Sequence, residues 1–190
     1  MIDAFKEYLN SFITLTDNEV TSLTSKLVHK ELRKKELFVR AGDICSKILF
    51  FKSGYFRFFH FDYNGNEITS DFIFAPGIIT SYTSLLTGKP SFVNVQVMED
   101  IEILELKKSD LYYLYNQYQN FEKLGRLIAE SVAKSSEEHL FLLLNQPAEV
   151  RYKKLVEKYP QFIKNIPLQY IASYLGITQE TLSRMRKTYK

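Results

Sequence analysis

Residues 167–190 read PLQYIASYLGITQETLSRMRKTYK, and this stretch decides the fold of the C-terminal part of the chain. Its first half has apolar residues at the i, i+3, i+4, i+7 spacing of one helix face, namely Leu168, Ile171, Ala172 and Leu175. Gly176 follows where a helix can end in the left-handed conformation that glycine adopts without strain. Thr178 is a suitable N-cap for a second helix, on which Leu182 and Met185 are spaced to pack back on the first. We therefore predict a helix-turn-helix, although an ordinary helical hairpin that closes a core would share this pattern.

The other side of the predicted second helix carries side chains that can form hydrogen bonds. They are Thr178, Gln179, Glu180, Thr181, Ser183, Arg184, Arg186 and Lys187. Such a face suits the major groove of DNA, whose base edges present donors and acceptors. Charge supports the same partner, because residues 147–190 hold nine Lys or Arg and three Asp or Glu, whereas the rest of the chain holds sixteen and nineteen. A basic end on a mildly acidic body indicates an anionic partner, with a solvated basic face as the simpler alternative.

Length and composition limit the classes of protein to which the chain can belong. The chain has 190 residues, 45% of them hydrophobic, which suffices for one large or two small domains with a real core. No apolar run approaches the roughly 18 residues that a membrane span requires, and the N-terminus lacks the pattern of a signal peptide. Cys45 is the single cysteine, so no disulfide can form within the chain. These features predict a soluble cytoplasmic protein without a membrane partner.

The middle of the chain predicts a β-structure that follows N-terminal helices, which we expect over residues 1 to about 30. Residues 35–107 alternate short runs rich in Phe, Ile, Val and Tyr with turns. The turns contain Gly42-Asp43, Ser53-Gly54, Asn64-Gly65-Asn66 and Pro76-Gly77. Asn-Gly between two alternating runs is a strong hairpin signal. Many short strands at this spacing predict an antiparallel barrel or jelly roll.

A long helix is predicted over residues 120–145. One stripe along it consists of Leu124, Ile128, Val132, Ser135, His139 and Leu142. Further apolar residues lie elsewhere around the helix, so it needs more than one neighbour. One side could cover the barrel, and the other could meet a second copy of itself, as coiled-coil seams do. The alternative is a helix that is fully buried within its own monomer.

With these elements in order, the chain resembles the Crp/Fnr superfamily of bacterial transcription regulators over nearly its whole length. The resemblance rests on Gly42-Asp43, on ILFFKSGYFRFF, on Asn64-Gly65 followed by Glu67, on FAPG, and on TQETLSRMRK, which is similar to the family's recognition helix. It implies an α+β protein with N-terminal helices, an antiparallel β jelly roll, a long dimerisation helix and a C-terminal helix-turn-helix domain. The implied division is a cyclic nucleotide-binding-like β-roll sensor domain over residues 1–119, the dimerisation helix over 120–146 and the DNA-binding domain over 147–190.

The resemblance also implies residue roles. Gln179, Glu180 and Arg184 would meet base edges, with Ser183 nearby, because these side chains can pair with adenine, cytosine and guanine. The residues nearer the phosphates would be Thr178, Thr181, Arg186, Lys187 and Lys190. A homodimer is implied because two recognition helices enter successive major grooves about 34 Å apart, and RNA polymerase is a further expected partner. The family usually has a β-hairpin wing after this helix, and without one before Lys190 some phosphate contacts would be lost.

Two departures concern the effector. Members that bind cyclic nucleotides use a Gly-Glu pair and an Arg-Ser or Arg-Thr pair, and the corresponding stretches here are Ser81-Tyr82 and Ser91-Phe92. The carboxylate and the guanidinium are both missing, and Lys89 on a loop is more simply solvated. A buried phosphate without a cation is costly. We therefore predict that the chain does not bind cyclic AMP through the family's contacts.

Other cofactors receive little support from the sequence. An oxygen-sensing iron–sulfur cluster needs about four cysteines, and Cys45 is more simply a buried filler. His60 is the only histidine in the strand region, which argues against a metal-dependent enzyme on a jelly roll. An unidentified small-molecule effector could occupy the roll, unless the apolar lining merely fills it. The expected lining residues are Phe72, Phe74, Ile79, Tyr82 and Phe92.

We conclude from the sequence that the chain is a homodimeric, sequence-specific DNA-binding transcription regulator and not an enzyme. The alternative is a ligand-sensing or protein-interaction module that does not bind DNA. The intact basic face of the last helix argues against that alternative.

Overall fold

The computed structural model describes residues 1–188, together with the side chains of these residues other than 161, 162 and 188. The chain divides into two compact units. The first contains Met1–Phe58 and Phe72–Ser131, and the second contains Phe59–Asp71 and Val132–Lys190. Within the described residues, no helix combines the length and the apolar character needed to cross a membrane.

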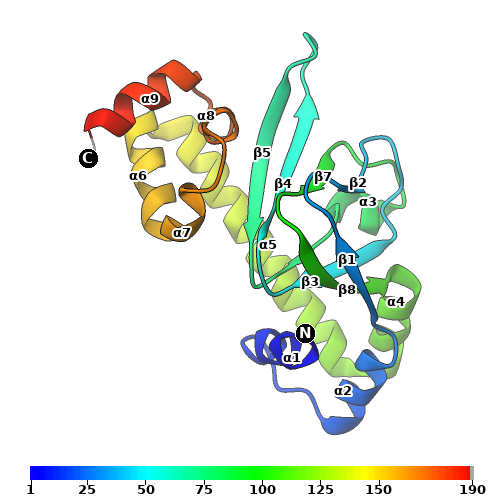
Figure 1. Cartoon of the computed structure of the whole chain (residues 1–190). Helices are drawn as coiled ribbons and strands as arrows, with labels where there is room; N and C mark the ends of the chain where they lie inside the picture. Colours follow the sequence, from blue (N-terminus) through cyan, green and yellow to red (C-terminus); the bar gives the residue numbers. More distant parts are fainter. Residues whose placement is uncertain (189–190) are drawn as a thin grey trace. The chain divides into compact units, whose positions relative to one another are not determined.

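Eight strands form two antiparallel sheets in the described part of the chain (Figure 1). One sheet has the order β1-β8-β3-β6 and the other has the order β2-β7-β4-β5. The strands are β1 (Val28–Leu32), β2 (Leu37–Val39), β3 (Lys47–Phe51), β4 (Tyr55–Phe61), β5 (Glu67–Phe74), β6 (Gly77–Ile79), β7 (Asn94–Val97) and β8 (Ile101–Lys107). The antiparallel strands predicted over residues 35–107 are confirmed. The helix expected up to about residue 30 ends at Thr24, because Val28–Leu32 pair with β8.

Both units contain helices. In the first unit they are α1 (Ile2–Asn10), α2 (Asp17–Thr24), α3 (Tyr82–Thr87) and α4 (Lys108–Gln117). In the second unit they are α6 (Ala148–Lys158), α7 (Pro160–Ile163), α8 (Leu168–Tyr174) and α9 (Gln179–Thr188). The predicted long helix is α5 (Gln119–Asn145), which runs from the first unit into the second. The mixed α+β class predicted from the sequence is confirmed.

Strand β8 explains how the first unit is assembled. Its residues Ile101 and Ile103 belong to an apolar cluster between the sheets, whereas Leu104 and Leu106 belong to a cluster shared with helices. Successive strand residues point to opposite faces, so β8 is buried on both sides. The helix-side cluster includes Phe5, Leu9, Leu114, Phe121 and Leu124.

Hydrogen bonds at the start of α2 fix this helix and connect it to α5. The hydroxyl of Thr16 accepts a hydrogen bond from the backbone N–H of Glu19, and the Glu19 carboxylate accepts one from the N–H of Thr16 at 2.8 Å. This capping box begins α2. The same carboxylate also accepts a hydrogen bond from Nδ2 of Asn120 at 3.1 Å, which ties α2 to the start of α5.

Candidate nucleic-acid interface

The turn between α8 and α9 has the geometry that its residues predict. Gly176 has φ +65°, and its N–H donates to the carbonyl of Ser173 at 3.0 Å. The N–H of Ile177 donates to the carbonyl of Ala172 at 3.0 Å, which closes the end of α8. Thr178 Oγ1 accepts from the N–H of Thr181 at 3.2 Å, as an N-cap does. The predicted glycine stop and threonine cap are therefore confirmed.

The two helices pack through the apolar residues that the sequence indicated. Ile171 and Leu182 are both 0% exposed. Ala172, Leu175 and Met185 are also buried. Because the apolar side of α9 is used against its own unit, its polar side is turned outward.

That polar side is exposed along most of its length. Gln179, Glu180, Ser183, Arg184 and Lys187 are exposed, as is Thr178 ahead of the helix, whereas Thr181 and Arg186 are half-buried. Hydrogen bonds from its own backbone N–H and from Thr178, together with the charge of Arg184, hold the pKa of Glu180 below its ordinary value. Glu180 is therefore a carboxylate, and an acceptor only, at neutral pH. Lys190 lies outside the described residues.

The six residues predicted to form a dimer seam on α5 do not share one environment. Leu124 is buried in the helix-side cluster of the first unit, and Ile128 packs against the same cluster. His139 stacks on the ring of Tyr174, with 4.6 Å between ring centroids. Val132 and Ser135 are exposed and Leu142 is half-buried. Leu124 and Ile128 therefore serve the monomer, because the cluster with α1 and α4 uses that side of α5.

The exposed apolar surface of α5 lies beside this stripe. Leu140, Phe141 and Leu144 are 55%, 56% and 74% exposed. These residues were visible in the sequence as apolar positions around the helix. Only the packing decides which side of α5 is left uncovered.

The five residues expected to line an effector pocket are not brought together. Ile79 lies in the cluster between the sheets, whereas Phe72 and Phe74 pack with Tyr55 elsewhere. Ile73 packs against the inner cluster, so strand alternation turns its two phenylalanine neighbours to the other face. Tyr82 and Phe92 are 37% and 76% exposed.

Residues 81–91 correspond to the stretch that holds the cyclic nucleotide in other members, and serine hydroxyl groups here form hydrogen bonds within the protein. Ser81 and Ser91 are buried, and their Oγ atoms lie 2.8 Å apart in a hydrogen bond. Ser84 Oγ donates to the carbonyl of Lys89 at 2.6 Å and accepts from the N–H of Cys45 at 2.9 Å. The side chain of Lys89 is exposed. The loop therefore offers buried hydroxyls that already have partners.

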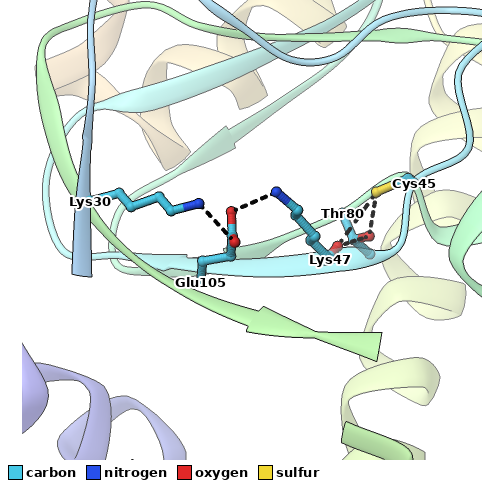
Figure 2. Close-up of polar contacts among 5 residues, drawn as sticks. All are labelled: Lys30, Cys45, Lys47, Thr80 and Glu105. Carbon is cyan, nitrogen blue, oxygen red and sulfur yellow. Dashed lines mark hydrogen bonds and ion pairs between the residues drawn. The ribbon is translucent and has the colours of Figure 1, made fainter. Parts of the chain in front are cut away.

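A cluster of charges that the sequence did not predict lies on β1, β3 and β8 (Figure 2). The Glu105 side chain is 7% exposed, and it accepts from Nζ of Lys30 at 2.9 Å and Nζ of Lys47 at 3.2 Å. Burial alone would raise the pKa of Glu105, but the two lysines outweigh it and hold the pKa below its ordinary value. Figure 2 also shows Cys45, whose Sγ lies 3.3 Å from Oγ1 of Thr80. As predicted, Cys45 is buried.

Comparison with known proteins shows which domain, relatives and solved structures this chain resembles. The model of the cyclic nucleotide-binding domain matches residues 29–118. The anaerobic regulatory protein of Haemophilus influenzae is 24% identical over 192 residues, which cover 90% of this chain and 71% of that protein. Among solved structures, FixK2 from Bradyrhizobium japonicum has a TM-score of 0.72 and 18% identity, over 85% of this chain and 83% of that one. A transcriptional regulator of the Crp/Fnr family from Eubacterium rectale has a TM-score of 0.70 and 16% identity, over 92% and 83% of the two chains.

The chain carries a match to the cyclic nucleotide-binding domain and resembles regulators of the Crp/Fnr superfamily in sequence and in fold. The solved structures establish its fold, and the curated relatives are named as regulatory proteins. The resemblance inferred from the sequence is confirmed, and the names of these relatives agree with the expectation that the chain is not an enzyme.

Proposed function

We propose that this protein is a homodimeric, sequence-specific DNA-binding transcription regulator of the Crp/Fnr superfamily. In this proposal α8 and α9 form a helix-turn-helix, and the two sheets form a jelly-roll sensor domain. The observation that carries the proposal is the two-sidedness of α9, on which Leu182 and Met185 are buried while Glu180 and Arg184 are exposed. An exposed helix face of hydrogen-bonding side chains matches the base edges of a major groove.

The roles of single residues follow from their positions on α9. Arg184 would bond guanine through two of its guanidinium nitrogens, Glu180 would accept from cytosine N4, and Gln179 would pair with adenine. Lys187 lies near the end of the helix and would contact phosphate, which positions the protein without reading sequence.

The dimer would form along the exposed side of α5. Residues recur there at alternating spacings of four and three, which is the periodicity of a coiled-coil seam. They are the exposed Ala133, Ser136 and Leu140 and the half-buried Ala129 and Leu143. Leu140 is 55% exposed, and Leu144 beside the seam is 74% exposed. This set contains none of the six residues of the stripe that the sequence analysis predicted, two of which, Leu124 and Ile128, are packed within the monomer.

The proposed regulator does not use cyclic AMP through the family's contacts. The buried Ser81–Ser91 hydrogen bond supports this view, because a bound phosphate would meet neutral hydroxyls and no buried cation in this loop. Desolvating an anion without a counter-charge is unfavourable. An effector of different chemistry and a contact with RNA polymerase stay expectations based on the family.

Selection of bound duplexes from a random DNA library, followed by anisotropy titrations, tests the function. Arg184→Ala should weaken binding to the selected site by about 1–3 kcal/mol and relax the preference at one base pair. Lys187→Ala should weaken binding to all duplexes alike and lower the salt slope by about one phosphate contact. Enrichment of no sequence would favour the interaction-module alternative. Equal losses on selected and unrelated DNA for Arg184→Ala would remove its assigned role.

A further inference from the structure

Arg151 on α6 joins the ends of two other helices. Its Nη1 donates to the carbonyl of Gln146 at 2.6 Å and to that of Leu143 at 3.3 Å, both at the end of α5. Its Nη2 donates to the carbonyl of Leu175, which is the C-cap residue of α8. A Cβ on the neighbouring Gly176 would lie 3.9 Å from the same Nη2. The guanidinium therefore occupies the corner where α5, α6 and α8 meet, within a single compact unit.

The chemistry of this corner suits arginine in particular. The last carbonyls of a helix lack partners within the helix and carry the negative end of its dipole. One planar guanidinium can donate in several fixed directions, whereas a lysine ammonium is a compact charge that cannot span two helix ends in the same way. Nε of Arg151 is buried without a hydrogen-bond partner among the described residues, so the group has exchanged water for these carbonyls. Its removal would leave carbonyls of both helices without a donor.

A second contact holds α8 at the adjacent residue. The ring of Tyr174 stacks on His139 of α5, with 4.6 Å between centroids and 18° between planes. Tyr174 and Leu175 are consecutive, so the end of α8 is attached to α5 directly and through α6. A helix end held at two adjacent residues has little freedom to change its angle.

The attachment of α8 to α5 links the proposed dimer surface on α5 to the proposed DNA-binding face of α9. The exposed Leu140 and Leu144 lie on α5, and the exposed face of α9 follows α8 after one tight turn. In a two-fold dimer along α5, the angle between α5 and α8 sets the separation of the two α9 helices. Half-sites in DNA are read at one fixed separation, about one helical turn of 34 Å.

We propose that Arg151 is a positioning residue that fixes this angle and thereby selects the spacing of the two DNA half-sites. The effect on DNA rests on the proposed function, whereas the effect on the angle does not. Arg151→Met and Arg151→Lys are the informative variants. Lys154→Met is the matched control, because it removes one positive charge from an exposed position of the same helix.

The angle is measured without DNA by pulsed electron resonance. Spin labels are placed on Lys134→Cys in α5 and Ser183→Cys in α9 of a Cys45→Ser background, and labelled chains are diluted with unlabelled protein so that each distance lies within one chain. The parent and Lys154→Met should give one narrow distance distribution. Both Arg151 variants should broaden it about twofold or more, because the corner loses a fork that spans two helices. An unchanged width in the Arg151 variants, with circular dichroism confirming that they are folded, would overturn the proposal.

DNA binding is then measured on the selected full site, on one half-site, and on sites whose half-site spacing is altered by one or two base pairs. Arg151→Met should lose about tenfold or more on the full site and discriminate less between spacings, because linked binding requires both contacts to fit at once. Its affinity for one half-site should match that of Lys154→Met. Equal losses on half-site and full site would mean that Arg151 merely maintains α9, and would overturn the spacing role. Parent protein that binds no DNA would refute the proposed function, while the label distances would still decide whether Arg151 fixes the angle.

Discussion

Replacing Leu182 with alanine tests whether α9 is anchored through its apolar side, on which the exposure of Arg184 depends. Leu182 on α9 is 0% exposed, as is Ile171 on α8. The substitution removes three carbons, and at about 0.8 kcal/mol each the lost transfer free energy is about 2.4 kcal/mol. The cavity left behind adds to this cost, so the total should fall within about 2–5 kcal/mol.

Hydrogen exchange of peptides covering α8 and α9 provides the assay. A loss of about 2.4 kcal/mol lowers amide protection by about 50-fold, since each 1.4 kcal/mol is tenfold. Ser183→Ala is the control at the next residue, which is exposed, and alanine's higher helix propensity should leave protection equal or slightly raised. Similar protection in both variants, or a loss below about threefold for Leu182→Ala, would refute the buried placement of Leu182.

Three further predictions concern other parts of the molecule. Because Lys30 and Lys47 outweigh the effect of burial and hold the pKa of Glu105 below its ordinary value, ionised Glu105 stabilises the fold at pH above that ordinary value, and the contribution is lost as pH falls through the lowered pKa. The difference in unfolding free energy between parent and Glu105→Gln should therefore be full at pH 7 and shrink in acid; a constant difference from pH 7 to 3 would contradict this. Leu140→Asp should convert the proposed dimer to monomer in sedimentation, because it would bury a charge in an apolar seam, whereas Phe92→Asp, at a position 76% exposed, should not. Calorimetric titration with cyclic AMP should give no binding at micromolar concentration, and a micromolar Kd would overturn the view that the Ser81–Ser91 pair excludes it.

Short-range features of the candidate site were predictable from the sequence. The glycine stop at Gly176, the cap at Thr178 and the apolar spacing of Leu182 and Met185 all involve residues within a few positions of one another. Backbone conformation and hydrogen bonding act over that range, so their effects can be inferred from adjacent letters. The strand-rich middle was predictable for the same reason, although β1 was not, because its strand character depends on pairing with β8.

Long-range contacts account for what was missed. Strand alternation places Phe72 and Phe74 away from Ile79, and only the pairing of the sheets shows which face each residue meets. Likewise, nothing near Glu105 in the sequence indicates that lysines from two other strands converge on it.

The sequence by itself indicated the family resemblance, through its motifs. It also determined the α+β class and the cap, turn and polar face of the last helix, because these follow from local periodicity and from residue types at fixed spacing. The tertiary structure alone decided which side of α5 is uncovered and that Arg151 joins α5 to α8. Those outcomes depend on which distant residues meet: Leu124 is covered by the helix-side cluster, and Leu175 lies 24 residues from Arg151 in the chain. Burial and hydrogen bonding across such separations are set by the packing of whole elements, which no short segment specifies.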